Sequence, residues 1–575
     1  MESSGLTYDL IKKIRAASAY FGNHHTDEKK QLLLQAGKCK IKNVSTLVAY
    51  HDCLLFLLAY PETKELLHMA RNELLRVGMV SKKFSSGVNK RNSIQLVNTG
   101  VVWSKIQVSF SYDLIKWLIH EYRGRVQLFS IDANPETVRN IILHGLTDIE
   151  YESWLSKKLS IQKCIQHLKK DNNLSDLEFL LLLFENINCT NRIRDTLFES
   201  LELFVQWSLD EDSPSKTFAR SLKRNLFFHK SALYRKVNST RLINQPIAKS
   251  SILSSAEKKH LITIARGILS MFLRETDPVT YADADRVELY DMKRGIDVAL
   301  YPMISARRLS LESYIGYQSF KNQIPVAYGG GWIFEYSCKI GINIFEAFRG
   351  GESAYLFSQI LRLYRWRFNI KQFVIEPYQL GKNNLEGLQS GAFWFYYRLG
   401  FLPENGELKL LAEKEFIKIT EIKTYRSSIE VMKRLADSNM ILDLDPNNSF
   451  LNQDVSKWSN LITYIINTCF NGNRRQAEEY SMKLLIDNLD TKPVNWNRSE
   501  HSLMKNLSVL LASVPHLNKW TLKDKQKLLK WLQAKENGSE MESIQLFQKH
   551  KMLINSLRNL MENPVKAISS HSAMV

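Results

Sequence analysis

Residues 348–401 contain the pattern that most constrains the fold. They read FRGGESAYLFSQILRLYRWRFNIKQFVIEPYQLGKNNLEGLQSGAFWFYYRLGF. An Arg-Gly-Gly turn precedes apolar residues at helical spacing over 353–368, a short apolar run at 373–376, and an aromatic stretch at 391–401. A period near 3.6 predicts a helix, and a short apolar run bounded by turn residues predicts a buried strand. The segment therefore predicts the order loop, helix, strand, loop, helix, which belongs to a mixed α and β domain.

The loop at residues 349–354, RGGESA, lies between an expected strand and the first of these helices. The first turn of a helix has unpaired N–H groups and a partial positive charge, which suit an anion such as phosphate. Glycine lets the backbone approach a ligand where a side chain would block it. The loop predicts an anion site. The alternative is a tight turn in which Ser353 or Glu352 caps the helix.

Several positions in this segment resemble the GNAT superfamily of acyl-CoA-dependent N-acyltransferases. Arg349 and Ala354 match the first and last positions of that family's pyrophosphate-binding loop, whereas Glu352 stands where the family has glycine. Asn384 lies in the loop after the expected strand, where the family often has an asparagine near the cofactor. Tyr396 begins a match to the family's Tyr-x-x-x-Gly-Phe ending.

The resemblance implies an α+β fold in which residues 261–425 form a GNAT-like mixed β-sheet with flanking helices. It also implies that acyl-CoA is the cosubstrate and that an amine attacks its thioester directly, without a covalent enzyme intermediate. Tyr396 would then protonate the departing thiolate, although a run of aromatic residues on a helix is also typical of a core. The residues implied around the cofactor are Arg349, Gly350, Gly351, Glu352, Ser353, Ala354 and Asn384.

Acylation of an ammonium group also requires a proton acceptor. No histidine occurs between His260 and His501, so within this domain the acceptor is expected to be a carboxylate or a water. The same gap excludes a Ser-His-Asp site confined to the domain, and we expect no metal site. The candidate bases, each of which could instead be an ordinary solvated or ion-paired carboxylate, are Glu335, Glu346 and Glu376.

Three consecutive glycines, Gly329 to Gly331, follow an expected hairpin across residues 321–323. They predict either a hairpin end or bulge, or a place where the backbone approaches a ligand or partner.

The flanking regions have different compositions, and a strand is expected within them at residues 94–97. We expect a helical N-terminal region at 1–80, a mixed α/β then helical region at 93–209, a basic linker at 210–260, and a helical C-terminal region at 426–575.

The formal charge of +19 suggests affinity for polyanions, and much of the excess lies in residues 214–259. Aromatic side chains alternate with cations there, which could serve nucleic acid binding, although a solvated linker is the simpler explanation of the composition. No apolar run is long enough for a membrane helix and the start lacks a signal-peptide core, so we expect no membrane insertion and a cytoplasmic location. Two alternatives to an enzyme acting on an amine-bearing substrate remain: an inactive GNAT-like scaffold or interaction protein, and a nucleic-acid-associated protein.

Overall fold

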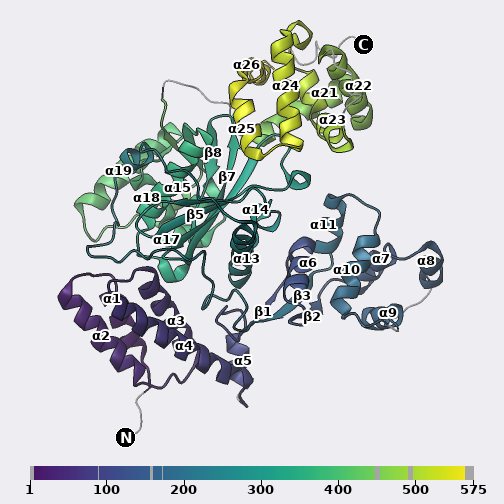
Figure 1. Ribbon diagram of the computed structural model, residues 1–575. Helices are drawn as coiled ribbons and strands as arrows, with labels where there is room; N and C mark the ends of the chain where they lie inside the picture. Colours follow the sequence, from purple (N-terminus) through teal and green to yellow (C-terminus); the bar gives the residue numbers. More distant parts are fainter. Residues whose placement is uncertain are drawn as a thin grey trace.

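The computed structural model describes residues 5–88, 90–155, 160–170, 172–446, 454–489 and 496–563. Helices flank a large mixed sheet, so the expected α+β class is confirmed (Figure 1). Within these ranges no helix is long and apolar enough to cross a lipid bilayer.

The N-terminal region consists of helices whose apolar faces join the core of the sheet domain. Leu47, Leu54 and Phe56 belong to the same buried cluster as Val298 and Phe357 of the sheet domain. The region is therefore packed against the sheet rather than tethered to it. Its helices are α1 (Tyr8–Ala17), α2 (Asn23–Gly37), α3 (Val44–Ala59), α4 (Lys64–Ser86) and α5 (Lys90–Leu96).

The prediction of a strand at 94–97 is wrong, because α5 covers most of that run and buries Leu96. A run of four residues is too short to distinguish the period of a strand from one helical turn.

The described part of residues 105–208 forms a small unit whose core includes Ile115, Leu180 and Trp207 and also takes in Met271 of the next domain. Its sheet is antiparallel in the order β1-β3-β2. The elements are β1 (Lys105–Val108), α6 (Tyr112–Glu121), β2 (Val126–Ile131), α7 (Pro135–Leu143), α8 (Asp148–Leu155), α9 (Ile161–Leu168), α10 (Asp176–Asn186), α11 (Asn191–Glu199) and β3 (Leu203–Ser208).

The central sheet has the order β11-β12-β10-β8-β7-β6-β5-β4, and β9 pairs with β7. Among its described strands β8 and β10 form the one parallel pair, and the other pairs are antiparallel. The strands are β4 (Glu288–Asp291), β5 (Ile296–Tyr301), β6 (Ser313–Lys321), β7 (Ile324–Phe334), β8 (Ser337–Ile340), β9 (Asn343–Ile344), β10 (Gln372–Ile375), β11 (Leu402–Pro403) and β12 (Met440–Asp443). Because β12 lies between β10 and β11, the sheet extends beyond residue 425, where we expected the domain to end.

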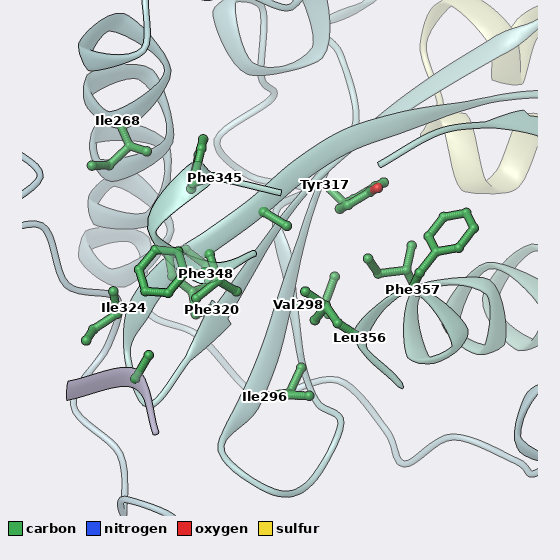
Figure 2. Packing of buried hydrophobic residues seen from close by; sticks show 14 of the residues in the cluster. Ile268, Ile296, Val298, Tyr317, Phe320, Ile324, Phe345, Phe348, Leu356 and Phe357 are labelled. Atoms are coloured by element: carbon green, nitrogen blue, oxygen red, sulfur yellow. The ribbon is translucent and has the colours of Figure 1, made fainter. Parts of the chain in front are cut away.

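Helices cover both faces of this sheet. Figure 2 shows Ile268 of α13 on one side of the strands and Leu356 and Phe357 of α15 on the other. A parallel pair needs a crossover connection, and α15 makes that connection between β8 and β10. The helices of this domain are α13 (Ser255–Met271), α14 (Asp277–Thr280), η1 (Ser305–Arg307), η2 (Glu346–Phe348), α15 (Ser353–Phe368), α16 (Pro377–Leu380), α17 (Leu385–Ser390), α18 (Ala392–Arg398), α19 (Gly406–Glu421) and α20 (Ile429–Leu435).

The β6–β7 hairpin turns through Asn322 and Gln323, which have φ values of +48° and +72°. Positive φ at both central residues matches the twist of the flanking strands and favours asparagine at the first position. The turn places Lys321 at the last position of β6.

The three glycines lie within β7 rather than at a hairpin end, so that part of the prediction is wrong. They permit close packing: a Cβ on Gly331 would lie 2.5 Å from the ring of Tyr364 on α15 and 2.6 Å from the Cys338 sulfur.

We expect Gly331→Ala to lower the free energy of unfolding by about 1–3 kcal/mol, the usual cost of overpacking a core. Chemical denaturation measures this, and Gly406→Ala is the matched control because a Cβ there meets nothing within 4 Å. Equal stability of the two variants would contradict the packing argument.

The basic segment at 210–260 is irregular except for α12 (Ser239–Ile243) and the start of α13. It lies against the core and is partly buried: Thr217 and His229 are almost inaccessible, whereas Lys230, Arg235 and Lys236 are exposed. The Phe227 ring lies 5.0 Å from the guanidinium carbon of Arg294, a contact inside the protein.

The C-terminal region is a helical bundle with its own core, docked beside β7 and β8 (Figure 1). Gln548 donates hydrogen bonds to the backbone carbonyls of Glu335 and Phe368, and Lys535 donates to that of Glu312. The described elements are α21 (Val455–Phe470), α22 (Arg474–Leu489), α23 (Arg498–Ala512), η4 (Leu517–Lys519), α24 (Leu522–Glu536), α25 (Glu540–Lys549) and α26 (Lys551–Glu562).

Candidate functional site

A cavity of about 320 Å³ lies where the parallel strands β8 and β10 end and α15 begins. The ladder joins Ser337–Lys339 to Gln372–Val374, and each strand ends one residue beyond it. The cavity is lined by Ile342, Asn343, Ile344, Arg349, Ser353, Gln379, Asn384, Glu386, Gly387, Ser390, Ala392, Phe395 and Tyr396. Four residues expected at the site from the sequence, Arg349, Ser353, Asn384 and Tyr396, therefore meet in one cavity.

The N-terminus of α15 has no side-chain cap. Its first intrahelical bond runs from Leu356 N–H to the Glu352 carbonyl at 2.8 Å. The backbone N–H groups of Ser353, Ala354 and Tyr355 have no hydrogen-bond acceptor among the described residues. Neither Ser353 nor Glu352 caps the helix, so the first turn keeps its unpaired donors and its partial positive charge. Since Ser353 lines the cavity, this positive end is available to an anion there.

Glu352 points away from the cavity and is 1% exposed. Its carboxylate contacts Lys321 at 2.8 Å and Arg294 at 2.6 Å, and it accepts a hydrogen bond from the Tyr234 N–H at 3.0 Å. Burial alone would raise the pKa of Glu352, but these partners together lower it to about 2. The Glu352 carboxylate is therefore neutralised by partners outside the cavity and leaves the cavity free of its negative charge.

The other loop residues have distinct positions. Arg349 lines the cavity, and its half-exposed guanidinium forms an ion pair with Glu386. Gly350 has φ +81° and open space around it. A Cβ on Gly351 would lie 2.5 Å from the Tyr60 hydroxyl, so this glycine serves packing against α3. Ala354 is the second residue of α15 and is outside the cavity lining.

Asn384 shapes the loop on the opposite side of the cavity. Its side-chain oxygen accepts a hydrogen bond from Gly387 N–H at 3.2 Å and caps α17, and its side-chain nitrogen donates to the Tyr378 carbonyl at 3.1 Å. The side-chain oxygen and nitrogen of Asn384 therefore both make hydrogen bonds that stabilise the loop forming this wall of the cavity.

Tyr396 on α18 lines the cavity and is 2% exposed. Its ring makes edge contacts with Phe357 and Phe401. Burial raises the pKa of Tyr396 above its usual value, and a backbone hydrogen bond with Ile342 opposes that effect only partly. The phenol therefore carries its proton at neutral pH and can donate it inside the cavity.

The three candidate bases do not line this cavity. Glu335 has φ +55° at the β7–β8 turn and lies 3.3 Å from Arg558 of the C-terminal bundle. Glu346 starts η2 and lines two other cavities together with Asp52. Glu376, directly after β10, is half exposed and lies 3.5 Å from Lys339.

Sequence reasoning missed Gln379 and Glu386, which both line the cavity. Glu386 occupies the first turn of α17, where an acidic residue is common because it interacts favourably with the helix dipole. The sequence therefore did not indicate that Glu386 pairs with Arg349. Among the described residues no cluster of three or more histidine, cysteine or acidic side chains is arranged to hold a metal ion.

Comparison with known proteins adds no assignment: no family model, curated protein or solved structure matches the chain.

Proposed function

We propose that this protein is an acyl-CoA-dependent N-acyltransferase and that the cavity beside α15 holds the cofactor. The supporting observation is that one cavity contains an arginine, an uncapped helix N-terminus and a buried neutral tyrosine. The resemblance to GNAT proteins assigns these three features to pyrophosphate binding and to leaving-group protonation. The strand–loop–helix–strand order around a parallel pair agrees with that resemblance.

In the proposed reaction the amine nitrogen attacks the thioester carbonyl carbon. A C–N bond forms, the C–S bond breaks, and the sulfur takes the proton of the Tyr396 hydroxyl, which later recovers a proton from solvent. The amine must arrive neutral or lose its proton to a water or a carboxylate. Arg349 and the amides of Ser353–Tyr355 bind and orient the pyrophosphate, which holds the thioester near Tyr396.

Arg349 supplies the test of the anion site. Replacement by alanine removes a charge-assisted contact worth about 1.5–3 kcal/mol, so we expect the Kd for coenzyme A to rise about 10- to 100-fold. Isothermal titration calorimetry with coenzyme A, acetyl-CoA and a longer acyl-CoA measures the change. Arg398→Ala, at the exposed end of α18, removes the same charge outside the cavity and is expected to leave Kd unchanged. Equal Kd values for the two variants would contradict the assignment of Arg349.

A further inference from the structure

The N-terminal helices hold the cofactor loop at both of its ends. At one end, the Arg15 guanidinium of α1 donates a hydrogen bond to the Arg349 carbonyl at 2.8 Å. At the other end, Glu352 N–H donates to the hydroxyl of Tyr60, the residue that ends α3, at 3.3 Å. Residues 349–352 are thus bracketed by side chains more than 290 positions earlier in the chain.

Both of these side chains have fixed positions. The Arg15 guanidinium lies 3.4 Å from the centre of the Phe56 ring on α3. Tyr60 is 6% exposed, and burial raises its pKa, so the hydroxyl stays protonated and uncharged. Its oxygen lies 2.5 Å from the position that a Cβ on Gly351 would take, so the loop passes α3 at a distance that excludes a side chain there.

The end of α3 is also tied to the turn that holds Glu352. Asn322 donates a side-chain hydrogen bond to the Ala59 carbonyl at 2.8 Å, and the adjacent Lys321 contacts the Glu352 carboxylate. The Pro61 carbonyl accepts a hydrogen bond from His229 N–H at 2.8 Å. The hairpin turn, α3 and the start of α15 therefore form one connected unit.

We infer that Arg15 and Tyr60 are positioning residues for the cofactor site and that the N-terminal helices belong to that site. They hold the loop so that Glu352 stays outside the cavity and the N-terminus of α15, at Ser353, borders it. A pyrophosphate-bearing ligand gains from this arrangement, whereas a ligand without phosphate does not. The inference rests on the proposed function for its ligand, but the effect on the loop is independent of any ligand.

Tyr60→Phe and Arg15→Gln test this inference in the full chain. Losing one loop hydrogen bond is expected to weaken binding of coenzyme A about fivefold and to leave binding of pantetheine, which lacks the pyrophosphate, unchanged. In the ligand-free protein, amide hydrogen exchange at Gly351 and Glu352, whose N–H groups are hydrogen-bonded, is expected to accelerate by a similar factor of about five. Tyr20→Phe and Lys12→Gln are the matched controls, since both side chains are exposed and lie on the same N-terminal region away from the loop.

The binding measurement and the exchange measurement test the proposed function and the positioning role separately. No coenzyme A binding by the unaltered protein would refute the proposed function, while faster exchange in the two variants would still support the positioning role. Unchanged exchange at Gly351 and Glu352 together with an unchanged ratio of coenzyme A to pantetheine affinity would overturn the inference. An equal loss of affinity for both ligands would also overturn it, because general destabilisation and not loop positioning would then explain the variants.

Discussion

Glu352→Gly is expected to lower the free energy of unfolding by about 3–5 kcal/mol, the usual cost of removing one partner from a buried ion pair. The substitution leaves the cations of Lys321 and Arg294 buried without their shared carboxylate. The backbone has no need of glycine, since Glu352 has φ −97°. The GNAT loop pattern alone predicts that glycine is tolerated here, because that family has glycine at this position of the loop. Guanidinium chloride unfolding followed by tryptophan fluorescence measures the change.

Two further variants separate charge from backbone effects. Glu407→Gly changes an exposed glutamate in the first turn of α19 and is expected to cost about 0.5–1 kcal/mol, the intrinsic penalty of glycine in a helix.

Glu352→Gln keeps the shape of the side chain and removes its charge. The pKa of Glu352 falls from 4.5 to about 2 on folding, so its carboxylate stabilises the folded state above about pH 4.5. That contribution is lost as the pH falls toward 2, and the stability difference between the protein and Glu352→Gln should shrink over this range. A Glu352→Gly variant that is as stable as the parent and binds coenzyme A more tightly would refute the role assigned to Glu352.

Tyr396→Phe is expected to lower kcat by at least about 100-fold, the lower end of the contribution of a positioned general acid. Phenylalanine keeps the ring contacts with Phe357 and Phe401 but has no proton to give to the departing thiolate. The Kd for coenzyme A should change less than about twofold, because the residues proposed to contact the pyrophosphate lie elsewhere in the cavity. Release of free thiol from acetyl-CoA, assayed with a panel of primary amines, measures the rate.

Tyr397→Phe is the matched control for this prediction. Tyr397 is the next residue on α18, packs against Phe393 and Phe416, and is outside the cavity lining. Turnover by Tyr396→Phe equal to that of Tyr397→Phe would remove Tyr396 from the chemistry and leave it as a packing residue.

Local patterns predicted the parts of the fold that depend on neighbours in the chain. The helix expected at 353–368 and the hairpin across 321–323 both occur, because helical periodicity and turn chemistry act over a few residues. The sequence also predicted that Ser353 and Tyr396 lie on two helices of this segment, and both residues line the cavity.

The features that were missed depend on contacts between distant segments. The partners of Glu352 lie 31 and 58 residues earlier in the chain, and Tyr60 lies 292 residues earlier. Local sequence patterns do not show such contacts, so the sequence alone could not predict which residues neutralise the Glu352 carboxylate. Strand β12 was missed because its four residues follow a helix and acquire their strand conformation by pairing with β10 and β11.

A crystal structure with coenzyme A bound tests the central proposal most directly. We predict that the pyrophosphate oxygens lie within hydrogen-bond distance of the Ser353–Tyr355 amides, that Arg349 leaves Glu386 to contact them, and that the sulfur lies near the Tyr396 hydroxyl. Glu352 should keep its contacts with Lys321 and Arg294. Coenzyme A bound elsewhere on the chain, or a cavity that stays without ligand at saturating coenzyme A, would contradict the proposal.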